Sequence, residues 1–401
     1  MTKKQDKKFA KAMIIFALVI VLIILVLNII YMQYVLTKKN FYRKELAYQD
    51  YITNHSEIKY VFFGDSHTFH AIHPKFIPNS FNFGSGTENY VKTYYLLDRI
   101  INKDKIKVNI VVLQIDLETF STWLTNEPFL FNELELYSQF VPLSKVKQIR
   151  KNDSLIKLFV EAKLPVIGKG QEFGIFFSKE NLSEMYEGWI KNYNDFSNLT
   201  ETERLKIAED GYKVHFKNQQ ISNLSLEYFI KTIELAKKNN INIILIKYPM
   251  SKEYKDITTE QGIYNISKQD YYKIIFDNAN QVLGEDYSVL DYQNLFLSEP
   301  EYLGDTYHVN YKGAEILSKK IYEDLQELNL SSGSSSQKPD NIISLDKKIN
   351  EFNQINEFNQ ISYFFVISLT LELIILLGIL IYLMQKTKSN KSNKSFKTLP
   401  D

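Results

Sequence analysis

Three polar residues of this chain could together activate a hydroxyl group for attack on a carbonyl. Ser66 follows Gly64 and residues 60–63, a short run of aromatic and β-branched residues typical of a buried strand. The carboxyl end of such a strand is where ligands bind in α/β sheets, and the N–H of a residue that starts a helix could hold an oxyanion. Asp305 and His308 are three residues apart, so one turn can place the carboxylate beside the imidazole. A carboxylate in that place fixes the tautomer of an imidazole base.

Each of these two motifs is weak evidence by itself. A Gly-Asp-Ser triplet is common by chance, and a lone Asp-x-x-His is also typical of a surface turn with an incidental ion pair. Their order and spacing resemble the SGNH (GDSL-like) hydrolase superfamily over roughly residues 59–328. The resemblance implies Ser66 as nucleophile, His308 as base and Asp305 as the residue that orients the base. It also implies an α/β three-layer sandwich with a parallel sheet, and it implies no cofactor.

The donors that would stabilise an oxyanion are less well defined. Residues 81–86, FNFGSG, are typical of a short strand with a glycine-rich turn, although an ordinary strand-to-helix loop has the same composition. In the resembled family a glycine here donates to the oxyanion, and the Asn of a Gly-x-Asn-Asp motif after the next strand adds a further donor. Residues 114–116, QID, stand at that place instead, which leaves the further donor open. The candidate donors are Ser66, Gly84 or Gly86, and one of Asn82, Asn89 or Gln114.

Three histidines near the candidate nucleophile raise the alternative of a metal site. His67, His70 and His73 recur every third residue, and three histidines can bind zinc. This spacing distributes the rings around a helix, and Pro74 ends any helix that begins at Ser66. We therefore expect no metal site.

Two long apolar runs predict membrane spans. Residues 12–36 carry no charge and are long enough to cross a bilayer as one helix, whereas a cleaved signal peptide has a shorter core and a small-x-small cleavage site. Residues 362–385 form a second run interrupted only by Glu372, which should face protein rather than lipid. Lysines precede the first run and follow the second, so we expect both termini in the cytoplasm.

These runs divide the chain into segments. The expected order is a basic tail (1–11), a span (12–36), an extracytoplasmic domain (37–330), a linker (331–361), a second span (362–385) and a basic tail (386–401). The net charge of +1, from 48 basic and 47 acidic residues, gives no electrostatic reason to expect nucleic acid as a partner. The absence of cysteine excludes disulfides and thiolate metal sites.

Alternation of strand and helix patterns predicts right-handed crossovers and a parallel sheet. The expected strands are 60–63, 81–83, 108–115, 241–248 and 288–291, and the expected helices are 87–102, 224–239, 268–283 and 311–328. An insertion at about 118–222 is rich in aromatic residues and mostly helical, without a clear strand. Its aromatic residues could line a groove for a sugar chain, but a small core of their own is favoured. They include Trp123, Pro128, Phe131, Trp189 and the pair 211–212.

The resemblance and the two spans together favour one function over two others. A doubly anchored chain of this plan resembles the D-alanyl-lipoteichoic acid transfer protein and the alginate and peptidoglycan O-acetylation proteins. That resemblance implies an O-acyltransferase in a bacterial cell membrane that passes an acyl group, expected to be acetyl, through Ser66 to a cell-surface polysaccharide or cell-wall polymer. The implied partner is a polytopic membrane-bound O-acyltransferase, with Glu372 as one contact to it or as a residue that packs on the first span. The alternatives are a membrane-anchored esterase and a non-catalytic scaffold.

Overall fold

The computed structural model describes residues 3–126, 129–169, 172, 184–284 and 287–331. By its internal contacts the chain divides into two units, residues 1–334 and 335–401. The predicted second span (362–385), its linker and the terminal tail therefore lie outside the described residues, apart from Ser331, and stay predictions.

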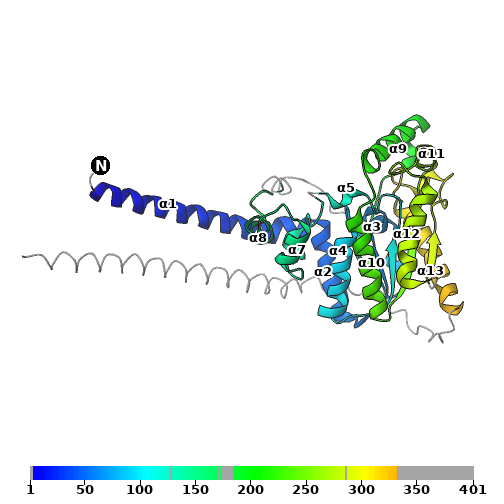
Figure 1. The fold of residues 1–401 in the computed structure, drawn as a ribbon, viewed down its shortest axis with the longest axis horizontal. Helices are drawn as coiled ribbons and strands as arrows, with labels where there is room; N and C mark the ends of the chain where they lie inside the picture. Colours follow the sequence, from blue (N-terminus) through cyan, green and yellow to red (C-terminus); the bar gives the residue numbers. More distant parts are fainter. Residues whose placement is uncertain (1–2, 127–128, 170–171, 173–183, 285–286, 332–401) are drawn as a thin grey trace, which may run out of the picture. The chain divides into compact units, whose positions relative to one another are not determined.

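A five-stranded parallel sheet forms the centre of the first unit (Figure 1). Its order is β2-β1-β3-β6-β7, and every neighbouring pair is parallel. The strands are β1 (Glu57–Phe63), β2 (Ser80–Asn82), β3 (Lys107–Gln114), β6 (Asn242–Lys247) and β7 (Ser288–Asp291). The five predicted strands are thus present, each with its ends within a few residues of the expected positions.

Side chains alternate between the two faces of the sheet, and both faces are buried. In β1, Val61 and Phe63 pack into one apolar cluster while Tyr60 and Phe62 pack into the other. Continuous apolar runs are typical of parallel strands covered on both sides, since neither face meets water. One face is covered by α2 (Asn40–Asn54), α4 (Tyr90–Asp98), α10 (Asn223–Lys238) and α12 (Lys268–Leu283), and the other by α3 (Ser66–Ala71) and α13 (Tyr311–Ser331). The expectation of an α/β sandwich with a parallel sheet is confirmed.

The predicted insertion is mostly helical, but the expectation that it lacks strands is wrong. Its helices are α5 (Thr122–Thr125), α6 (Leu134–Tyr137), α7 (Leu143–Ile149), α8 (Leu155–Lys163) and α9 (Glu201–His215); α11 (Lys252–Glu260) packs against α9. A two-stranded antiparallel hairpin joins β4 (Met185–Tyr186) to β5 (Trp189–Ile190). Its turn residues Glu187 and Gly188 both have positive φ, at 43° and 90°, which matches the tight turns of two-residue hairpins. Strands of two residues are too short to leave an alternating pattern in the sequence.

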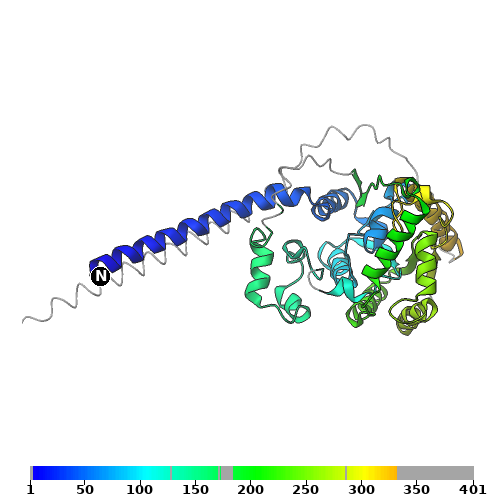
Figure 2. The ribbon, with the colours of Figure 1, turned by 90° about the horizontal axis from the view of Figure 1, so that it is seen from above.

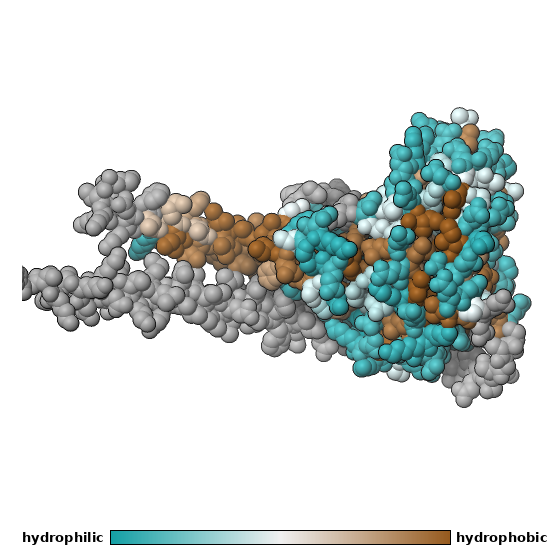
Figure 3. Space-filling model, in the orientation of Figure 1, coloured by the Kyte–Doolittle hydropathy of each residue, from teal (hydrophilic) through white to brown (hydrophobic). Residues whose placement is uncertain are grey.

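The amino-terminal helix α1 (Lys3–Ile30) is the one helix among the described residues that is long and apolar enough to cross a membrane. The candidate span runs from Ala10 to Val35 with a mean hydropathy of 3.5, and 6% of its most apolar window is buried. Most of α1 projects from the domain, as Figure 2 shows. Its surface is hydrophobic along most of its length (Figure 3). Length and composition alone fit a membrane anchor and a signal sequence equally. The last part of the span is a π-helical turn, Tyr31–Val35, whose first and last side chains are fully buried.

Candidate active site

Ser66 lies at the first position of α3, directly after the sharp turn that ends β1. Asp65 caps this helix, because its carboxylate accepts a hydrogen bond from the N–H of His67 at 2.9 Å. Gly64 is required by close packing, since a Cβ there would overlap the side chains of Gln114 and Thr68. The turn therefore presents the Ser66 hydroxyl at the carboxyl edge of the sheet while Asp65 points inward.

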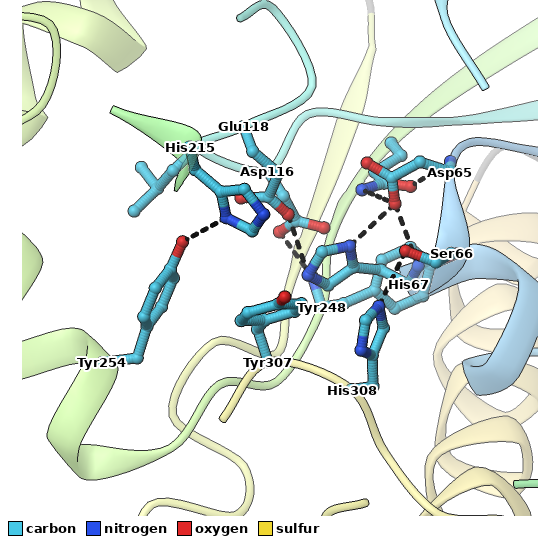
Figure 4. A network of polar contacts seen from close by, with 12 residues as sticks. Asp65, Ser66, His67, Asp116, Glu118, His215, Tyr248, Tyr254, Tyr307 and His308 are labelled. Atoms are coloured by element: carbon cyan, nitrogen blue, oxygen red, sulfur yellow. Dashed lines mark hydrogen bonds and ion pairs between the residues drawn. The ribbon is translucent and has the colours of Figure 1, made fainter. Parts of the chain in front are cut away.

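The structure brings Ser66, His308 and Asp305 into one chain of hydrogen bonds (Figure 4). His308 Nε2 lies 2.7 Å from Ser66 Oγ, and His308 Nδ1 lies 2.8 Å from Asp305 Oδ2. The other carboxylate oxygen of Asp305 accepts from the N–H groups of Tyr307 and His308 at 3.0 and 2.9 Å. A carboxylate held at both oxygens cannot rotate, and it fixes the imidazole with Nε2 toward the hydroxyl.

Electrostatics keep the Asp305 carboxylate ionised. Burial by itself would raise its pKa, but the His308 imidazole and the two backbone donors outweigh burial and lower the pKa to about 2. His70, whose ring centroid lies 5.5 Å from that of His308, has its pKa lowered to about 4, chiefly by burial. His70 is therefore neutral at physiological pH and adds no positive charge beside His308.

Asn82 and Gly84, two of the candidate oxyanion donors, are hydrogen-bonded to each other. Asn82 Nδ2 donates to the carbonyl oxygens of Thr68 and Ile72, each at 2.8 Å, and Asn82 Oδ1 accepts from the Gly84 N–H at 2.8 Å. Asn82 is fully buried. Neither group can serve an oxyanion without giving up these bonds, so both groups hold the α3 turn in place.

Gln114 and Asn89 are also committed elsewhere. Gln114 Oε1 accepts from the N–H of Asp65 and from Thr68 Oγ1, both at 2.9 Å, and Gln114 Nε2 donates to Asp65 Oδ1 at 2.9 Å. Asn89 caps α4 and donates to the carbonyl of Leu124 at 3.2 Å. The hydrogen-bonding groups of both side chains are therefore occupied and are not available as oxyanion donors.

Two of the candidate oxyanion donors stay accessible. The N–H of Ser66 belongs to the first turn of α3, whose amides have no partner within the helix. Gly86 is exposed and has open space around it, and its N–H makes no hydrogen bond to another described residue. These two backbone groups are the remaining candidates among those that the sequence suggested.

A second cluster of ionisable groups lies directly behind the nucleophile turn (Figure 4). His67 is buried, with Nδ1 2.7 Å from Asp65 Oδ1 and Nε2 2.8 Å from Glu118 Oε1. The second contact has the distance of an ion pair. The His67 ring also lies 4.8 Å from that of His308, between ring centroids. The cluster thus touches both the nucleophile turn and the base.

The charges in this cluster depend on one another. Burial alone would lower the pKa of His67, but Glu118 and Asp65 outweigh burial and raise it well above its usual value. Burial likewise opposes ionisation of Asp65, yet His67 and Gln114 lower its pKa to about 2. Asp116 lies in the same cluster, and its pKa is raised, first by burial and then by the charge of Glu118. The directions of these shifts favour an imidazolium between two carboxylates and favour the neutral form of Asp116 beside them.

The three histidines that suggested a metal site have separate partners. His67 faces its two carboxylates, His70 Nδ1 lies 3.2 Å from the carbonyl oxygen of Ile190, and His73 stacks on Trp189 with ring centroids 3.9 Å apart. Asp65, His67 and Glu118 do bring three ligand types within 4.8 Å of one another. Zinc would hold each ligand atom at about 2.0–2.2 Å. Two atoms held by one zinc ion at that distance lie about 3.4 Å apart in a tetrahedral site, whereas the His67 ring nitrogens lie only 2.7 and 2.8 Å from the carboxylate oxygens.

Glu118 was not named as a site residue from the sequence, and Asp116 was considered only as part of the departure from a motif at residues 114–116. A usable signal was present, because two carboxylates follow β3 at the edge of the sheet where Ser66 lies. The insertion aromatics are mainly core: Phe131 and Trp189 are buried, whereas Pro128 lies outside the described residues. Tyr212 lines a cavity of about 540 Å³ between α9 and residues 261–265, and none of the triad residues lines it.

Comparisons with known proteins found similarity only among solved structures. No family model matches the chain, and no curated protein matches it. A GDSL-like lipase from Bacteroides thetaiotaomicron is 12% identical, with a TM-score of 0.33, over 72% of this chain and 100% of that one. A protein named as an acylhydrolase from Bacteroides fragilis is 11% identical, with a TM-score of 0.30, over 67% and 87%. A protein named for platelet activating factor from Streptococcus pneumonia is 12% identical, with a TM-score of 0.32, over 70% and 92%. Likenesses of this size do not show which reaction the chain performs.

Proposed function

We propose that the chain is a serine-dependent acyl-transfer enzyme of the SGNH type. The observation that carries this proposal is the continuous contact from Asp305 through His308 to Ser66, at 2.8 and 2.7 Å. His308 Nε2 would take the proton of the Ser66 hydroxyl while Oγ forms a bond to the carbonyl carbon of an ester or thioester. When the tetrahedral intermediate collapses, His308 returns that proton to the leaving alcohol or thiol, and an acyl ester stays on Ser66.

The oxyanion of that intermediate needs donors at the start of α3. The Ser66 N–H is fixed there by the Asp65 cap, and the exposed Gly86 N–H comes from the loop after β2. Ser66 and His308 are both partly exposed, so an acyl donor can approach them without a change in the fold. Donors that are already oriented stabilise developing charge without reorganisation.

We assign the acyl group to an acceptor hydroxyl on a cell-surface glycan or cell-wall polymer. Support comes from α1, whose apolar length fits a membrane anchor, and from the apolar residues 362–385, which fit a second span. With both termini cytoplasmic, the site would lie outside the cell membrane, where acyl-CoA is absent. A polytopic membrane-bound O-acyltransferase would then deliver the acyl group, which we expect to be acetyl. An esterase is the second candidate, because water attacking the same acyl-enzyme completes a hydrolysis.

Active-site labelling of the detergent-solubilised full chain tests the nucleophile. A fluorophosphonate probe should modify the wild type at Ser66, and the Ser66→Ala and His308→Ala variants should not be labelled. Ser197→Ala, which alters an exposed serine in a surface turn, should be labelled like the wild type. Normal labelling of a folded Ser66→Ala variant would exclude Ser66 as nucleophile and would favour the scaffold.

Transfer and hydrolysis differ in the group that attacks the acyl-enzyme. With an activated acetyl ester, intact-mass measurement should show one acetyl group on Ser66. An acceptor oligosaccharide bound in place has an effective molarity of about 10⁵ M or more against roughly 55 M water, so its acetylation should exceed hydrolysis. Rapid hydrolysis with no transfer to any cell-wall or capsular glycan would favour the esterase.

A further inference from the structure

The short helix α8, Leu155–Lys163, is apolar on two adjacent sides. Leu158 and Ala162 are buried against the domain. Leu155, Ile156 and Phe159 point away from it with 55%, 78% and 51% of their surface exposed, and Ile167 in the turn after the helix is 44% exposed. We call these four exposed residues the α8 face. A surface helix of a globular protein normally has one apolar stripe, directed toward its core, so a second apolar side calls for a second environment.

The carboxyl end of α8 is attached to the outer end of α1. Asn28, in the last turn of α1, donates from Nδ2 to the carbonyl oxygen of Lys163 at 3.1 Å and accepts from the N–H of Val166 at 3.4 Å. Glu172 pairs with Lys39 Nζ at 2.6 Å and accepts a hydrogen bond from Tyr31. Figures 1 and 2 both show α8 beside the end of α1 that meets the domain. The position of α8 along the axis of α1, and hence its depth in a bilayer that α1 crosses, is therefore fixed by these contacts.

The length of α1 gives the depth of Asn28 and of the attached end of α8 relative to the bilayer. The candidate span begins at Ala10, and Asn28 is 18 residues further along (28 − 10). At about 1.5 Å per residue this distance is about 27 Å, close to the roughly 30 Å of hydrocarbon in a bilayer. Asn28 and the attached end of α8 then lie at the outer boundary of the hydrocarbon. Tyr34, 57% exposed, follows at the level where aromatic rings are enriched.

We propose that the α8 face is an interfacial membrane anchor that inserts into the outer leaflet where headgroups meet acyl chains. The occupant of this face is lipid, because a helix tied to the end of a span has its exposed apolar side chains at the depth where lipid is the neighbour. This inference rests on the proposed insertion of α1 in the membrane and is independent of the chemistry at Ser66. Two attachments, a span and a surface helix, would hold the catalytic domain in one orientation over the bilayer.

Single-cysteine labelling of the full chain in phosphatidylcholine vesicles tests the anchor, and the absence of native cysteine makes each site unique. The variants Ile156→Cys, Val19→Cys and Leu205→Cys carry an environment-sensitive nitrobenzoxadiazole label. Val19 lies midway between Ala10 and Asn28 and is 47% exposed. Leu205 is the matched control, an exposed leucine of α9 at 43%. Doxyl-labelled lipids with the quencher at carbon 5 or carbon 12 report the depth of each label.

The expected result is that the label at position 156 emits at a blue-shifted wavelength and is quenched best by the shallow doxyl group. The label at position 19 should be quenched best by the deep group, and the label at position 205 should not be quenched. Quenching at position 19 without quenching at position 156 would overturn the interfacial anchor while membrane insertion stands, and would leave the α8 face to a protein partner. Absence of quenching at both positions would refute the membrane anchoring itself, while the labelling of Ser66 would still report on the chemistry.

Discussion

Replacement of His67 by glutamine tests the buried charge cluster behind the nucleophile. His67 lies 2.7 Å from Asp65 and 2.8 Å from Glu118, and 5% of its side chain is exposed. Glutamine is polar but cannot carry a proton at these pH values. The His67→Gln variant therefore leaves two buried carboxylates without their cation. Breaking a buried ion pair by removing one partner costs roughly 3–5 kcal/mol.

The distinctive expectation is how that cost changes with pH. In the wild type the pKa of His67 is raised, so its stabilisation is complete below about pH 6.5, the pKa of an unfolded histidine, and is lost as pH rises through the higher folded value. The pKa values of Asp65 and Glu118 are lowered, so these groups are ionised in both states between about pH 4.5 and 6.5. His67, Asp65 and Glu118 therefore add no slope to wild-type stability in that window. Asp116, whose pKa is raised, adds a slope that the wild type and the variant share, so it cancels in their difference.

Without His67, burial dominates and raises the pKa of Glu118, so the folded variant holds a proton that the unfolded chain has released. Its stability then falls by about 1.4 kcal/mol for each pH unit above about 4.3. Relative to the wild type, the destabilisation should grow by about 3 kcal/mol between pH 4.5 and 6.5. Above about pH 6.5 the folded wild type also keeps a proton on His67 that the unfolded histidine has released, so the difference should level off.

Urea denaturation of the detergent-solubilised full chain measures this difference, with the fluorescence of Trp123 and Trp189 as the signal from the domain. His55→Gln, at an exposed histidine of the surface, is the matched control and should show no pH-dependent difference from the wild type. A His67→Gln destabilisation that is constant from pH 4.5 to 6.5 would refute the assignment of an imidazolium to His67.

Three more side chains give predictions of their own. Lys44→Met should raise the free energy of unfolding by about 1–3 kcal/mol at pH 7, because burial lowers the pKa of this amine and its Nζ lacks a hydrogen bond in the described residues. A lower free energy of unfolding in urea denaturation would instead point to a role for the cation. Gly84→Ala should destabilise by about 1–3 kcal/mol, since a Cβ would lie 2.6 Å from the backbone nitrogen of Phe69, and an unchanged urea midpoint would contradict this packing. Asp305→Asn should fold like the wild type but slow fluorophosphonate labelling of Ser66 by roughly 10³–10⁴-fold, because the imidazole of His308 loses the carboxylate that orients it. Labelling at the wild-type rate would remove Asp305 from the triad.

Local patterns in the sequence determined the elements and the fold class. Continuous apolar runs such as 108–115 predict buried strands from their own composition. The helix α12 begins and ends at the predicted residues 268 and 283. Ser267 caps that helix by accepting from the N–H of Asp270 at 3.0 Å, a contact made within four residues. Such features depend on residues that are close together in the chain, so they can be predicted without knowledge of the tertiary structure. The alternation of these elements then favours a parallel sheet with covered faces.

The contacts of the site were decided by the tertiary structure. Ser66 and His308 are 242 residues apart. Their residue types and the resemblance of their motifs to the SGNH superfamily suggested the pair, but the 2.7 Å contact exists because the end of β1 and the loop before α13 lie beside each other. His67 appeared as one member of a histidine repeat, whereas folding placed it between Asp65 and Glu118. Gln114 appeared as a candidate oxyanion donor, whereas packing directed its amide to Asp65 and Thr68. The direction of a side chain and the partner it meets depend on elements far away in sequence, which no local pattern specifies.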